Sequence, residues 1–238
     1  MGQRPLNERT SWDDGHDKVA YIADAVALAG GDGDKSTGAL APQVEKLLAR
    51  WEVLDVERRA KRRAVGKAHA LVRRRDLDAD TTVTDLHNDT MAQVKQDRAA
   101  PLFMRLFPDS LSVVVRMALE SELPVLRVLA HKLAEEETPG ALKKAHTKPL
   151  AEAIEKGDAA IRGREEAFAA AGRVTAKIAS WREDVNAVLL GVEGALKQIA
   201  AERKLGQAWV DTFFPIEKSK KGKKKQKGAE APEGTTPA

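Results

Sequence analysis

The feature that most limits how this chain can fold is a recurring spacing of apolar residues, alternately three and four positions apart. The spacing is clearest near the C-terminal end, at Trp181, Val185, Val188, Val192, Ala195 and Ile199. Side chains at these intervals lie along one side of an α-helix, whereas a half-buried strand alternates every second residue. Helical stripes also start at Val44 and at Leu150. The sequence therefore predicts an all-α fold.

Two segments, residues 42–108 and 149–215, share an outline. Each begins with a proline and ends with an aromatic residue followed by a proline. We predict a turn at 78–82 in the first segment and a break at Ser180 in the second, where Glu183 can complete a capping box. Two such hairpins predict an antiparallel helical bundle with four main helices and shorter connecting helices, because each helix has an apolar face to bury. Internal duplication and chance alignment of helical sequences both explain the shared outline.

The predicted organisation has five segments. They are an N-terminal arm with a short helix and a Gly-rich loop (1–39), a first helical hairpin (40–108), connecting helices (109–148), a second helical hairpin (149–215) and a Lys-rich tail (216–238). Trp12 is the large apolar residue of the arm and is expected to dock on the helices. The stretch from Lys218 to Lys227 has no apolar residue to bury, so the tail is predicted to be disordered.

The first long helix is predicted to change its buried face along its length. The stripe that starts at Val44 continues onto Arg58 and Lys61, which are charged. The residues of a neighbouring apolar stripe are Val53, Val56, Ala60, Ala64 and Leu71. A helix whose apolar stripe shifts sideways must rotate or bend to keep that stripe buried. In the second segment, the residues expected to face the core are Leu150, Ile154, Ile161 and Phe168.

Recognisable catalytic and cofactor-binding motifs are missing from the sequence. The chain has no cysteine, which excludes thiolate metal sites and a cysteine nucleophile. In the loop 30–38, the glycines that a phosphate-binding loop needs are replaced by Ala29 and Asp34. No histidine follows a glutamate at the three-residue offset typical of di-iron bundles. We assign no catalytic residue, cofactor or metal ligand, and an enzyme or cofactor-binding bundle of unfamiliar type is kept as an alternative.

Positive charge is unevenly distributed. The tail holds seven lysines and three glutamates, which accounts for the whole net charge of +4 and leaves 33 basic and 33 acidic residues in 1–215. Nine basic residues lie between Arg58 and Arg75. They can pair with acidic residues of neighbouring helices or bind the phosphates of a polyanion. The candidate polyanion contacts are Arg58, Arg59, Arg62, Arg63, Arg73, Arg74, Lys218, Lys220, Lys221, Lys223, Lys224, Lys225 and Lys227.

Taken together, these patterns favour a non-enzymatic helical protein that binds a protein partner, or copies of itself, through its helical faces. Its basic tail is expected to contact polyanions. The main alternative is a nucleic-acid-associated protein without sequence specificity that uses residues 58–75 and the tail. The tail has no aromatic residue, so it is not expected to stack on bases. No signal peptide or transmembrane segment is recognised, so a cytoplasmic location is expected.

Overall fold

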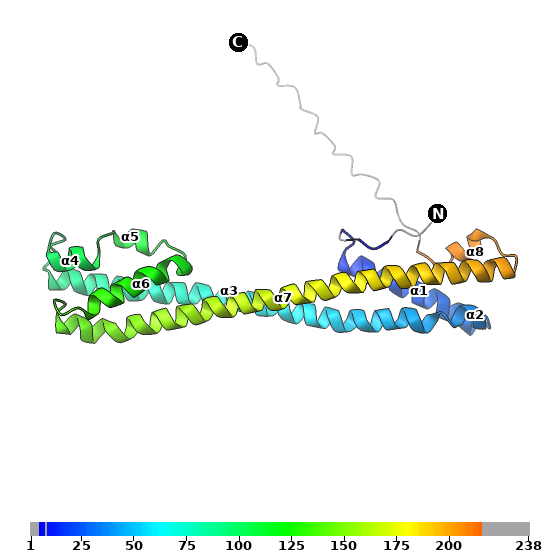
Figure 1. Cartoon of the computed structure of the whole chain (residues 1–238), viewed down its shortest axis with the longest axis horizontal. Coiled ribbons are helices and arrows are strands. Elements are labelled where there is room, and N and C mark those ends of the chain that lie inside the picture. Colours follow the sequence, from blue (N-terminus) through cyan, green and yellow to red (C-terminus); the bar gives the residue numbers. More distant parts are fainter. Residues whose placement is uncertain (1–4, 8, 216–238) are drawn as a thin grey trace, which may run out of the picture.

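Two long helices dominate the structure, a computed structural model that describes residues 5–7 and 9–215. Helix α3 (Ala41–Gln93) has 53 residues and helix α7 (Gly140–Glu202) has 63. They lie antiparallel and side by side along the length of the molecule (Figure 1). The described residues form helices and no strand, and the long helices pack closely on each other. The predicted all-α helical-bundle class is therefore confirmed.

Short helices cover the long pair only near its two ends (Figure 1). The proximal end carries α1 (Trp12–Gly31), α2 (Lys35–Gly38) and α8 (Gln207–Asp211). The distal end carries α4 (Pro101–Leu106), α5 (Leu111–Val114) and α6 (Leu119–Ala134). Each end has its own hydrophobic core. The molecule thus consists of two compact ends joined by a two-helix middle.

Three tryptophans from α1, α3 and α7 form the centre of the proximal core. Trp12 stacks on Trp51 with ring centroids 5.3 Å apart, and its centroid lies 5.0 Å from that of Trp181. The side chain of Trp181 is fully buried and donates its indole N–H to the carbonyl of Leu47. The predicted docking of Trp12 is confirmed. This residue begins α1 instead of lying in a loose arm, because the side chain of Ser11 caps the helix.

The Gly-rich loop predicted at 30–38 is a tight connection that contains α2. Asp34 caps α2 by accepting a hydrogen bond from the amide of Thr37. A Cβ atom added to Gly30 would lie 2.7 Å from the Cα atom of Gly38, and the converse also holds. A side chain at either position would push the two backbones apart, so the close approach of α1 and α2 requires glycine.

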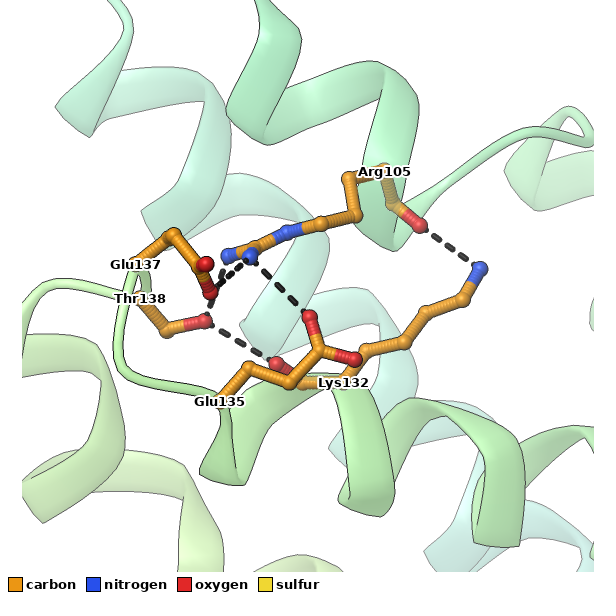
Figure 2. Close-up of polar contacts among 5 residues, drawn as sticks. All are labelled: Arg105, Lys132, Glu135, Glu137 and Thr138. Atoms are coloured by element: carbon orange, nitrogen blue, oxygen red, sulfur yellow. Dashed lines mark hydrogen bonds and ion pairs between the residues drawn. The ribbon is translucent and has the colours of Figure 1, made fainter.

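At the distal end, one arginine joins α4 to the loop between α6 and α7 (Figure 2). Arg105 donates to the carboxylates of Glu135 and Glu137 at 3.0 Å and to the hydroxyl of Thr138 at 2.7 Å. Lys132 in turn donates to the carbonyl of Arg105. A guanidinium group with several acceptors holds the loop in one conformation. The loop of residues 135–139 separates α6 from α7.

Both turns predicted inside the hairpins are wrong. Residues 78–82 lie within α3, where the hydroxyls of Thr81 and Thr82 donate to carbonyls four residues earlier and cap no new helix. Ser180 likewise lies within α7. Each hairpin segment therefore contributes one long helix in place of two shorter helices joined by a turn.

The predicted change of buried face in α3 is also wrong. The first stripe continues to be the covered one, since Val65 is partly buried and Val72 is buried. The neighbouring stripe faces solvent, with Val53 68% exposed and Val56 70% exposed. Arg58 is tolerated in the covered stripe because its aliphatic stem packs while its guanidinium group pairs with Asp55.

Candidate polyanion-binding surface

Among the described residues, the middle of the hairpin consists of α3 and α7 alone, and we call this region the waist (Figure 1). It comprises residues 56–75 of α3 and 162–180 of α7. Val72 and Val174 are its two buried residues, and the other side chains of the waist are partly or fully exposed. Among the described residues, no third helix packs along most of this pair, so many polar side chains of the waist are open to solvent.

Positive charge is concentrated in the waist. Its sequence has thirteen basic and three acidic residues, which is a formal net charge of +10. The remainder of residues 1–215 has 20 basic and 30 acidic residues. The balanced total therefore conceals a basic middle between acidic ends. A concentration of one sign of charge attracts polyanions of the opposite sign.

Two of the predicted contacts, Arg58 and Arg59, are held by one buried carboxylate. Asp55 is 3% exposed and accepts from Nε and Nη2 of Arg58 at 3.1 and 2.8 Å, while Arg59 pairs with its other oxygen. Trp12 donates its indole N–H to the same carboxylate at 3.0 Å. Burial raises the pKa of this carboxyl, but the hydrogen bonds from Arg58 and Trp12 and the charge of Arg59 outweigh burial. The pKa is therefore below its ordinary value.

The other four predicted arginines of the waist have no such partner. Arg62, Arg63, Arg73 and Arg74 are exposed, and none of their side chains forms an ion pair or hydrogen bond with another described residue. Arg75, at the end of the run, pairs within its own helix. Of the two alternatives for the basic run, pairing with acidic residues of neighbouring helices is therefore not found for these four arginines within the described residues.

The continuity of α3 sets the arginines in a row. Arg59, Arg62 and Arg73 are separated by three and eleven residues, and Arg63 and Arg74 by eleven, which are spacings that return to one side of an α-helix. At the usual rise per residue, the row from Arg59 to Arg74 is about 22 Å long. The absence of a turn in α3 keeps this row straight.

Helix α7 adds further basic residues to the waist. Arg162 and Arg173 are exposed and have no side-chain partner within the described part of the chain. Lys177 pairs with Glu57 of α3 at 2.9 Å. These residues were missed in the sequence because their position depends on how α7 aligns with α3, which no local pattern reveals. The predicted contacts in the lysine run 218–227 lie outside the described residues.

A pocket of about 200 Å³ lies between the two helices of the waist. Its lining residues are Arg58, Lys61, Arg62, Ala171, Val174, Thr175 and Ile178. Phe168 lies on the same side of α7 as Ala171 and Thr175, and its side chain is 48% exposed. The prediction that Phe168 faces the core is therefore wrong, because no third helix covers it. The result is an aromatic ring beside a pocket with cationic walls.

A second group of titratable side chains lies at the distal end. Glu122 of α6 is fully buried, and neither of its carboxylate oxygens has a hydrogen-bond partner among the described residues. Asp76 and Asp80 of α3 each have one buried carboxylate oxygen that also lacks a hydrogen-bond partner among the described residues. Burial and the charges of Asp80 and Asp76 raise the pKa of Glu122 to about 8. Across residues 5–7 and 9–215, no group of three His, Cys, Asp or Glu side chains is arranged to hold a metal ion.

The fold and the waist define an elongated all-α protein with a basic middle and acidic ends. No protein family, curated protein or solved structure matches the chain. Within the described residues, no helix combines the length and the apolar character needed to cross a membrane.

Proposed function

We propose that the protein is a helical scaffold that binds nucleic acid without sequence specificity through the waist and the Lys-rich tail. The observation that carries this proposal is the row of exposed arginines without a partner among the described residues, namely Arg62, Arg63, Arg73 and Arg74. Neighbouring guanidinium groups repel one another, and an anion that binds them relieves this repulsion. Nucleic acid fits because a duplex presents about one negative charge per 1.7 Å of its axis.

The dimensions of the waist support binding to phosphates over reading of bases. One α-helix with its side chains is about 10–12 Å across, and the major groove of a duplex is about 12 Å wide. In the waist α7 packs along α3, and two packed helices have axes about 8–10 Å apart, so the pair is too wide for that groove. Contacts to phosphates position a protein on nucleic acid and carry no sequence information.

Replacing Arg62, Arg63, Arg73 and Arg74 with glutamine is expected to weaken binding to duplex and single-stranded nucleic acid alike. If each arginine contacts one phosphate, the slope of log affinity against log salt concentration becomes shallower by about 3. Fluorescence anisotropy with the full chain at several salt concentrations measures both affinity and slope. The melting temperature is expected to change little, because these side chains have no partner within the described residues.

A matched control replaces four basic residues outside the waist with glutamine. The residues are Lys35, Lys46, Arg116 and Lys144, which are exposed and whose side chains have no partner in the described part of the chain. Both variants lose the same charge, so an effect of net charge alone would lower affinity equally in both. The proposal requires a much larger loss in the waist variant. Equal losses, or no binding by the wild-type chain at low salt, would contradict it.

The exposed apolar stripe of α3 supports a second candidate function, association with another copy of the chain. Val53, Val56 and Leu71 are 68%, 70% and 43% exposed and lie on one side of the helix. Packing a second helix on this stripe would remove its apolar surface from water. We expect the mass measured by light scattering to rise with protein concentration, and Val53→Ser combined with Val56→Ser to abolish the rise. A constant monomer mass for the wild-type chain would exclude self-association.

A further inference from the structure

One side of the waist combines an exposed aromatic ring with unpaired cations. Phe168 of α7 is 48% exposed, and the residues on either side of it, 167 and 169–172, are alanines and one glycine. Such small neighbours leave the ring uncovered. His69 of α3 meets it with the two rings perpendicular and their centroids 5.2 Å apart. This contact fixes the orientation of the ring relative to α3 and leaves about half of the side chain open to solvent.

Arginines of α3 lie on the same side of the hairpin as this ring. Arg62, His69 and Arg73 are separated by seven and four residues, so they share one face of α3. Phe168 and Thr175 are seven residues apart and share one face of α7. Because Thr175 and Arg62 line the same pocket, the two faces lie on one side of the waist. Along the axis of α3, His69 is about 10 Å from Arg62 and about 6 Å from Arg73.

We propose that this side of the waist binds single-stranded nucleic acid, with a base stacked on Phe168 and neighbouring phosphates bound by Arg62 and Arg73. The inference rests on the proposed nucleic-acid-binding function and specifies the form of nucleic acid. Aromatic side chains within a basic surface are the usual platform for unpaired bases, which stack on them whatever their sequence. A duplex keeps the faces of its bases within its own stack, so it offers phosphates to the arginines and no base to Phe168.

The full chain with Phe168→Leu tests this inference, because leucine is apolar but has no ring on which a base can stack. The probes are a labelled oligothymidylate of about 16 nucleotides, a labelled duplex of the same length, and linear polyphosphate as a competitor without bases. We expect the affinity for oligothymidylate to fall about 10-fold, and the affinities for duplex and polyphosphate to stay nearly unchanged. Phe168→Trp is expected to retain or strengthen binding of the single strand.

Tyr21→Leu provides the matched control, because Tyr21 is a 45% exposed aromatic residue outside the waist and should affect none of the three affinities. Unchanged oligothymidylate binding by Phe168→Leu, or equal losses for all three probes, would overturn the stacking inference. The proposed function has a separate readout in the four-arginine variant. If that variant loses affinity for all three probes while Phe168→Leu loses none, nucleic-acid binding by the waist stands and base stacking does not.

Discussion

Glu122→Gln is expected to raise the free energy of unfolding at pH 8 by on the order of 3 kcal/mol. Glu122 is fully buried and has no hydrogen-bond partner among the described residues, and burial and the charges of Asp80 and Asp76 raise its pKa to about 8. The folded protein therefore retains a proton that the unfolded chain releases near its ordinary pKa of about 4.5. Since the folded state binds more protons between these pH values, stability falls as pH rises from about 4.5 to about 8.

Glutamine removes this dependence because it is neutral at every pH in the range. Urea denaturation of both proteins between about pH 4 and pH 9 measures the difference. The free energies of unfolding of the wild-type protein and of Glu122→Gln are expected to be similar near the lower end of this pH range and to diverge as pH rises.

Glu120, two residues before Glu122, offers a control in which the fold lowers the pKa instead of raising it. A hydrogen bond from its own backbone amide and the ion pair with Arg164 lower the pKa of Glu120. Its contribution to stability is therefore present above its ordinary pKa and lost as pH falls, so Glu120→Gln should destabilise the protein slightly at neutral pH. If Glu122→Gln were instead less stable than the wild-type protein at pH 8, the burial of a protonated carboxyl at this position would be disproved.

Local spacing predicted which sides of the long helices are buried at the proximal end, because helical periodicity is a property of the sequence itself. Val44, Leu47 and Leu54 are buried in the proximal core, and so are Trp181 and Val192 of the opposite helix. The same spacing contains no information on how many other helices lie around a given turn. For that reason it wrongly predicted a shift of the buried face in α3 and a buried Phe168 in the waist, where the side chains are exposed.

The ends of the helices were harder to predict for a different physical reason. Threonine can cap a new helix, but it can also remain inside a helix when its hydroxyl donates to the preceding turn, as Thr81 and Thr82 do. Packing decides between these alternatives. Ala79 and Val83 are fully buried in the distal core, and this burial stabilises the helix through the segment where a turn was predicted.

The candidate site was predictable in α3 and only partly in α7. The basic run 58–75 is visible in the sequence, but whether its members are neutralised depends on which carboxylates the fold brings near them. Asp55 is one turn away from Arg58 and pairs with it, whereas Arg62 has no carboxylate partner within the described residues. Phe168 continues an apolar stripe, and its exposure follows from the lack of a third helix over the waist.

Asp55→Ala is expected to destabilise the protein and at the same time strengthen its binding to nucleic acid. The change leaves the buried indole N–H of Trp12 without an acceptor and Arg58 and Arg59 without a counter-charge. We expect a loss on the order of 3 kcal/mol in the free energy of unfolding. The two released arginines lie at the edge of the waist, so the salt dependence of binding should steepen by about 2 at temperatures where the variant is folded.

Asp55→Asn separates the two effects, because its amide oxygen can still accept from Trp12 while the charge is gone. It is expected to lose less stability than Asp55→Ala and to gain similar affinity. Asp184→Ala is the matched control, since Asp184 pairs with Arg50 at a half-exposed position outside the waist and should change neither quantity much. If the affinity for nucleic acid fell together with stability in both Asp55 variants, the pairs of Asp55 with Arg58 and Arg59 would support binding only by stabilising the fold. A rise in affinity despite lower stability would instead show that Asp55 neutralises two arginines that would otherwise bind nucleic acid and extend the surface.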